Sequence, residues 1–240
     1  DHQAVVSGLS KVLGVDEDRI DLTYSHSHSS GFYMPDRVVL PGGELIPDYL
    51  EAVAARASKA GASAIENLQE AVITFATGHC NMAANRDCHD EEFGGYVCGF
   101  NPDVEPDDTV LVGRVTDLAH RQVATLVNYG CHPTTLAWDN TLLSPDYVGT
   151  MREEVERVTD CPCIFAQAPS GNQGPRHGFV GDLNVADKNG RQLGFAALSA
   201  LMSMGPPGTD YEYQGPVISG ETIGTWAYTP LTEERREDSA

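Results

Sequence analysis

The chain has 240 residues, of which 41% are hydrophobic, so it is long enough to bury a sizeable core. Its 35 acidic and 15 basic residues give a formal net charge of −20 at pH 7, and the basic residues form no long cluster. Because binding to nucleic acid requires concentrated positive charge, this composition argues against a nucleic-acid partner. No apolar run approaches the roughly 20 residues that span a membrane, so no transmembrane segment is expected.

The first part of the sequence predicts two helices and two strands. Apolar residues at helical spacing predict a helix over 1–13 that stops at Gly14. Residues 19–27, RIDLTYSHS, predict a strand, and a second helix is expected over 47–69, with proline in its first turn. The β-branched and aromatic residues of 70–78 predict the next strand.

The remainder of the sequence continues the alternation of strands and helices. Residues 80–108 are polar and contain glycine and proline, which indicates a long connection of the kind that often carries function. The charged tail 233–240 is expected to be frayed. The other expected elements are strands over 109–117 and 122–132, a helix over 144–158, a short strand from 163 and a helix over 184–204. The expected fold class is therefore layered α/β, with a mixed sheet flanked by helices, in a single domain over 1–240.

The six cysteines show no Cys-x-x-Cys spacing of the kind that marks zinc ribbons or thioredoxin-like sites. An even count permits disulfides, but a chain of this size does not need them. Free thiols are therefore favoured.

Four polar segments fall where the predicted strands end: SHSHSSG, NMAANRD, NYGCHPTT and AQAPSGNQGPR. Strand ends are where α/β folds assemble their sites. In a strand, His26 and His28 would project from one face, and imidazole is a common zinc ligand; His132 follows another strand and could converge with them. Taken alone, such histidines are more often hydrogen-bonded polar residues than metal ligands, and both interpretations stay open.

Two further segments offer groups that bind anions. Arg86 presents a planar guanidinium suited to a carboxylate or a developing oxyanion, although an ion pair with Asp87 or one of the acidic residues after it is the simpler interpretation. Backbone amides of the glycine-containing segment 169–176 could line an oxyanion pocket, or form an ordinary turn.

Taken in this order, the segments resemble the neutral, non-lysosomal ceramidases, a family of zinc-dependent amide hydrolases. That family carries an HTHSGP-like segment, an NRS-like segment, an NxxxH pattern after a strand, an SGD segment and a final AQ(S/T)NxG motif that ends in SPN. This chain has HSHSSG, ANRD, NYGCH, LSPD and AQAPSGNQGPR, over about residues 20–180.

The resemblance implies a set of site residues and a cofactor, Zn²⁺. It assigns His26 and His132 as metal ligands, His28 and Arg86 as catalytic residues, and Asn172 and Gly174 to the substrate or oxyanion pocket. Two departures indicate a divergent relative with another substrate: Gly174 replaces the family's serine, and Gly31 and Phe32 replace the proline-bearing end of the first motif.

The function implied by the resemblance is hydrolysis of a linear amide bond in a small molecule or lipid by a metal-activated water. A non-catalytic binding or scaffold module is the alternative. The family's further zinc ligands, a Glu and a Tyr, lie well beyond the last motif, and Glu221 and Tyr228 are too close to it to be assigned. The chain is therefore expected to lack N-terminal and C-terminal parts, with the remainder of the same protein completing the site. A secreted or periplasmic location is implied by the resemblance alone.

The loop over 31–43 contains Phe32, Tyr33 and Met34. These side chains could line an apolar groove for a lipid, but packing of the loop onto the core is the favoured expectation.

Overall fold

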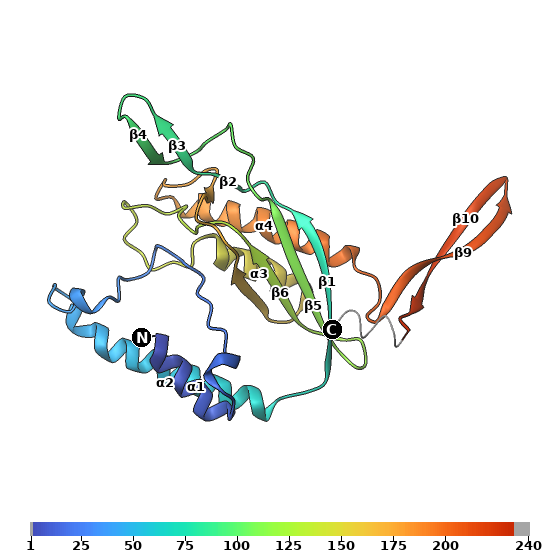
Figure 1. Ribbon diagram of the computed structural model, residues 1–240, viewed down its shortest axis with the longest axis horizontal. Coiled ribbons are helices and arrows are strands. Elements are labelled where there is room, and N and C mark those ends of the chain that lie inside the picture. Colours follow the sequence, from blue (N-terminus) through green and yellow to red (C-terminus); the bar gives the residue numbers. More distant parts are fainter. Residues whose placement is uncertain (1, 233–240) are drawn as a thin grey trace.

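The computed structural model describes residues 2–232 and shows a mixed sheet with two long helices packed on it (Figure 1). The sheet order is β1–β5–β6–β7, in which β1, β5 and β6 are antiparallel and β7 runs parallel to β6. The strands are β1 (Ala71–His79), β5 (Thr109–Asp117), β6 (Gln122–Tyr129) and β7 (Cys163–Gln167). The expected α/β class with a mixed sheet is confirmed, and the tail 233–240 lies outside the described residues.

One face of the sheet packs against α3 (Tyr147–Thr159) and α4 (Leu183–Ser203). The core between them contains fully buried side chains from strands and helices: Val110, Val112, Val127, Tyr129, Met151, Val155 and Leu193. The two helices approach closely at Gly190, where a Cβ would lie 2.5 Å from the carbonyl oxygen of Tyr147. Only glycine fits there, so this residue fixes the separation of the two helices.

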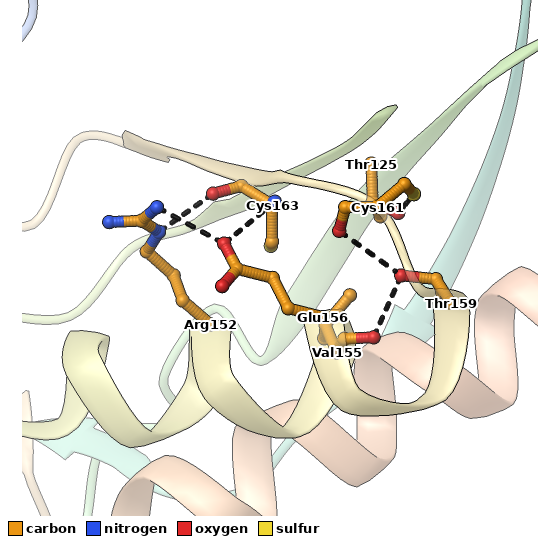
Figure 2. Close-up of polar contacts among 7 residues, drawn as sticks. All are labelled: Thr125, Arg152, Val155, Glu156, Thr159, Cys161 and Cys163. Atoms are coloured by element: carbon orange, nitrogen blue, oxygen red, sulfur yellow. Dashed lines mark hydrogen bonds and ion pairs between the residues drawn. The ribbon is translucent and has the colours of Figure 1, made fainter. Parts of the chain in front are cut away.

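A polar network ties α3 to the start of β7 (Figure 2). Glu156 Oε1 accepts hydrogen bonds from the backbone N–H of Cys163, at 2.9 Å, and from Arg152 Nη2, at 3.1 Å. Arg152 Nε donates to the Cys163 carbonyl oxygen at 2.7 Å. Both backbone groups of Cys163 are thus bound by side chains of α3, which sets the entry of β7 into the sheet.

We expect Glu156→Ala to lower the free energy of unfolding by about 1–3 kcal/mol, because it leaves the N–H of the buried Cys163 without its acceptor. The measurement is the midpoint of urea unfolding. Glu153→Ala is the matched control, since Glu153 is an exposed glutamate on the same helix. Equal midpoints for the two variants would show that the network does not contribute to stability.

The N-terminal part forms a helical hairpin that extends away from the sheet (Figure 1). It consists of α1 (His2–Leu13) and α2 (Ile46–Glu66), which contact each other. Both helices were predicted, and Gly14 ends α1 with a φ of 67°. The strand predicted over 19–27 is wrong: Arg19 ends a 3-10 turn, residues 20–27 have no regular secondary structure and pair with no strand, and His26 has a left-handed φ of 61°, which interrupts an extended backbone.

Two other segments differ from the sequence predictions. The connection over 80–108 is not without structure: it holds β2 (Ala83–Asn85) and a small hairpin of β3 (Asp87–Asp90) and β4 (Gly95–Cys98). β2 pairs with β8 (Gln173–Pro175), which joins two of the predicted site segments. The projecting hairpin of β9 (Thr209–Ser219) and β10 (Glu221–Pro230) was not predicted.

All six cysteines are free thiols, as the sequence favoured. Within residues 2–232, none of the helices combines the length and the apolar composition needed to cross a membrane.

Candidate metal centre

Three histidines from two distant segments converge at the carboxyl end of β6. Nε2 of His26 lies 3.1 Å from Nε2 of His132, although the two residues are 106 positions apart in the sequence. The ring of His28 is 5.1 Å from that of His26 and 5.6 Å from that of His132, measured between centroids. One nitrogen from each ring lies within 4.8 Å of the others, and in the described part of the chain these histidines form the only such group.

His132 is held so that its Nε2 faces this group. Its Nδ1 lies 2.7 Å from the carbonyl oxygen of Ser170 and 3.2 Å from that of Gln173. A carbonyl only accepts, so Nδ1 carries the proton and donates, and Nε2 keeps its lone pair. A metal-binding histidine is commonly oriented in this way by a backbone carbonyl on its other nitrogen.

The segment with His26 and His28 is fastened to the loop after β6 by short hydrogen bonds. Ser27 Oγ donates to the Ser144 carbonyl oxygen at 2.7 Å, and the Ser144 N–H donates to the Ser29 carbonyl oxygen at 2.9 Å. His26 has a φ of 61°, a left-handed conformation that is uncommon outside glycine and is often found at functional sites. The two histidines therefore converge through loop geometry and not through the alternation of a strand.

The surroundings favour neutral imidazoles. Burial lowers the pKa of His132, and the nearby Arg86 and His26 lower it further. Burial also lowers the pKa of His28, with contributions from His26 and Arg86 in the same direction. Neutral imidazole is the form that binds a metal.

The spacing of His26 and His132 fits two ligands of a zinc ion. With Zn–N distances of about 2.0–2.1 Å and tetrahedral angles, two ligand nitrogens lie about 3.3 Å apart. The observed Nε2 to Nε2 separation is 3.1 Å. A zinc ion would thus need only a small adjustment of His26 and His132.

Arg86 lies at the edge of this group, just after β2. Its Nε and Nη2 both donate to the carbonyl oxygen of Gly171, at 3.1 and 2.9 Å, and its N–H donates to the Asn172 carbonyl oxygen at 2.9 Å. No ion pair to Asp87 or any other acidic residue of 2–232 holds the guanidinium, so the ion-pair interpretation is wrong.

The other two predicted pocket residues lie on the segment that Arg86 contacts. Gly174 is buried in β8, opposite Ala84 of β2, and an added Cβ would lie 3.6 Å from Cδ of Arg86. Asn172 is exposed and touches the site through its backbone carbonyl. The three histidines thus form one group, and Arg86, Asn172 and Gly174 lie together on the segments around β8. His132 links the two groups, because its Nδ1 binds the carbonyl oxygens of Ser170 and Gln173.

A cavity of about 520 Å³ opens beside His28. A second, more apolar cavity of about 460 Å³ adjoins it, and the two share Gly31, Phe32 and Leu143 as lining residues. Phe32 is 72% exposed and Met34 57%, so the expectation that this loop packs onto the core is wrong for both. Phe32 and Tyr33 instead line the second cavity, as the groove interpretation suggested.

The sequence analysis assigned no role to Asp146, yet this residue supports the site. It is buried, with a φ of 54°, and its carboxylate accepts from the N–H of Leu136 at 2.9 Å and from that of Tyr147 at 2.7 Å. It thereby closes the loop between β6 and α3. The LSPD segment contains this residue, and it was singled out only for its resemblance to the family's SGD segment.

Comparison with known proteins agrees with this geometry at the level of the fold. No protein-family model matches the chain, and no curated protein sequence matches it. Among solved structures, the chain resembles a neutral ceramidase from Pseudomonas aeruginosa, with a TM-score of 0.60 and 16% identity over 92% of this chain and 40% of that one. It also resembles a ceramidase complexed with C2, with a TM-score of 0.61 and 16% identity over 92% of this chain and 39% of that one. The chain therefore shares the fold of part of a neutral ceramidase and spans about 40% of its length.

Proposed function

We propose that this chain carries part of the active site of a divergent, ceramidase-like zinc hydrolase that cleaves a linear amide bond in a lipid or small molecule. The convergence of His26 and His132, with their Nε2 atoms 3.1 Å apart, is the observation that supports it most directly. The fold shared with part of a neutral ceramidase, at 16% identity, supports the same conclusion.

In this proposal His26 and His132 hold the zinc ion. Zinc bound there would lower the pKa of a water molecule toward neutrality and polarise a carbonyl oxygen. Further ligands would come from the remainder of the same protein, since catalytic zinc normally has three protein ligands. The orientation of the His132 ring supports this assignment, because its Nδ1 binds backbone carbonyls and its Nε2 faces His26.

A location outside the cytoplasm is proposed only from the likeness to ceramidases.

His28 and Arg86 act on the substrate in this scheme. Burial holds His28 in its neutral form, in which one ring nitrogen can accept a proton and the other can donate one. Arg86 supplies a fixed positive charge next to the histidines, where negative charge develops on the carbonyl oxygen of a cleaved amide. The missing serine at position 174 is compatible with this chemistry because water, and not a side chain, attacks the carbonyl.

The adjoining cavities favour a substrate with a polar head and an apolar chain. His28 lines the first cavity, and the second is lined by apolar side chains, among them Phe32, Leu40 and Tyr49. The apolar chain of a substrate whose polar head lies beside His28 would enter the second cavity next to Phe32, which lines both cavities.

The test is the metal content of the full-length protein, purified without added metal, together with its hydrolysis of N-acyl amides of increasing chain length. About one zinc per chain and faster cleavage of longer acyl groups are expected. A zinc-loaded protein that binds these amides without cleaving any of them would favour the non-catalytic scaffold alternative. A protein that takes up no zinc would contradict the proposal.

The lowered pKa of His132 predicts how zinc binding depends on pH. Protons compete with zinc for a free imidazole around pH 6.5, its ordinary pKa. Because burial lowers the pKa of His132, protons displace zinc from this ligand only at a lower pH than from a free imidazole. At most one of the two histidine ligands should therefore compete with protons near pH 6.5, and zinc affinity should fall there by no more than about tenfold per pH unit. Calorimetric titrations with zinc between pH 8 and 6 are the measurement, and a loss steeper than this near pH 6.5 would contradict a His132 ligand whose pKa is lowered by burial.

A further inference from the structure

Thr134 carries a buried hydroxyl that has no hydrogen-bond partner within residues 2–232. Its side chain lies two residues after His132, and the residue is 3% exposed. The backbone around it is fully engaged: its N–H donates to the His132 carbonyl oxygen at 2.9 Å, and its own carbonyl oxygen accepts from the Phe179 N–H at 3.0 Å. Buried hydroxyls nearly always have a hydrogen-bond partner. A buried hydroxyl without one in the protein therefore indicates a partner on a bound molecule.

The hydroxyl faces a space left by Gly174. An ideal Cβ built on Gly174 lies 3.8 Å from Thr134 Oγ1 and 3.6 Å from Arg86 Cδ, and no atom is closer to it. Gly174 lies in β8 and needs no left-handed backbone, so the absence of a side chain there is not required by the turn of the chain. The glycine instead leaves methyl-sized room beside the Thr134 hydroxyl and the aliphatic part of the Arg86 side chain.

Thr134 also lines the cavity of about 520 Å³ that contains His28. Thr134 is therefore the residue that borders both the cavity and the room beside Gly174, since Gly174 and Arg86 do not line the cavity. The guanidinium of Arg86 uses Nε and Nη2 on Gly171, which leaves Nη1 without a partner among the described residues.

We propose that Thr134 is a substrate-binding residue whose Oγ1 donates a hydrogen bond to an oxygen of the bound acyl group, next to Arg86 and in the space that Gly174 leaves open. This inference rests on the proposed function, because the oxygen is the carbonyl oxygen of the amide substrate or a carboxylate oxygen of the acid that its hydrolysis forms. Thr134, on the segment after β6, would then supply the hydroxyl donor that Gly174 lacks.

The neighbouring Thr135 provides a matched control. It is fully buried like Thr134, but its hydroxyl accepts a hydrogen bond from Asn189 Nδ2 at 3.1 Å. Thr→Val keeps the shape of the side chain and removes only the hydroxyl. At Thr135 it removes a bond within the protein, and at Thr134 it removes none.

The experiment uses octanoate, a medium-chain carboxylate, as the probe and the full-length protein in wild-type, Thr134→Val, Thr134→Ser and Thr135→Val forms. Octanoate affinity is measured by calorimetry on zinc-loaded and on metal-free protein, zinc content by elemental analysis, and stability by the urea midpoint. We expect Thr134→Val to bind octanoate about tenfold more weakly or worse, with wild-type zinc content and an unchanged or higher midpoint, because a hydrogen bond to a charged acceptor is lost on binding only. Thr134→Ser should bind as the wild type does, and Thr135→Val should lose stability but not affinity.

Octanoate affinity within twofold of wild type in Thr134→Val would overturn the inference, and so would a loss of stability as large as that of Thr135→Val, which would indicate a purely structural hydroxyl. Absence of octanoate binding to zinc-loaded wild-type protein would also overturn it, while leaving the metal centre in place. Absence of zinc in the wild type would instead contradict the proposed function, and the titrations of metal-free protein would still decide the role of Thr134.

Discussion

Replacing His132 with alanine is expected to reduce the zinc content of the full-length protein from about one ion per chain to almost none. The same change should lower kcat/KM for amide hydrolysis on the order of 10³-fold or more, because metal assistance contributes several kcal/mol to the reaction. The large effect is expected because two backbone carbonyl oxygens bind Nδ1 of His132, so that its Nε2 faces His26 and is free to bind the metal. Zinc content by elemental analysis and initial rates with an N-acyl amide are the two measurements.

The control for this prediction is His89→Ala. His89 lies on the small β3–β4 hairpin, is exposed, and contacts Tyr96 rather than the three converging histidines. This variant should keep its zinc and its rate. Full zinc occupancy in His132→Ala would remove His132 from the ligand set, and loss of zinc in both variants would mean that the protein has unfolded.

The convergence of the three histidines could be predicted from the sequence to a large extent, but for a reason that was partly wrong. His26 and His28 were expected to share the face of a strand, and no strand exists there. They converge with His132 because serine hydroxyls and backbone groups fasten an irregular segment to the loop after β6. Local spacing indicated the residues, and the tertiary contacts that place them have no signature in a short window.

The residues that the sequence did not single out are those whose role depends on what surrounds them. Thr134 is an ordinary threonine in a polar segment, and only its burial without a partner beside Gly174 distinguishes it. The strands β9 and β10 were missed because they pair only with each other in a projecting hairpin, so their faces lack the alternation of a half-buried sheet. The helices α3 and α4 and the strand β6 were predicted because burial against one another imposes periods that a short window reveals.

Replacing Arg86 with methionine is expected to lower kcat/KM about 10²-fold while leaving zinc content unchanged, because the guanidinium acts on the developing negative charge and not on the metal. Most of the loss should appear in kcat, since a donor that acts mainly in the transition state changes KM little. Arg176→Met is the matched control: Arg176 is an exposed arginine just after β8 whose guanidinium lies over the ring of Phe100. Arg86→Lys keeps the charge but loses the planar pair of bonds to Gly171, so an intermediate rate is expected.

The pH profile of Arg86→Met separates an electrostatic role from loss of the Gly171 contact. Burial is the largest cause of the lowered pKa of His28, and the charge of Arg86 lowers it further. Without that charge the pKa of His28 rises, so the imidazole becomes protonated at a higher pH than in the wild type. If neutral His28 is the proton acceptor, the acid limb of kcat/KM must move to higher pH in Arg86→Met and stay in place in Arg176→Met. An acid limb that does not move, together with a wild-type rate at its plateau, would remove Arg86 from the active site and leave it as a residue that holds the loop at Gly171.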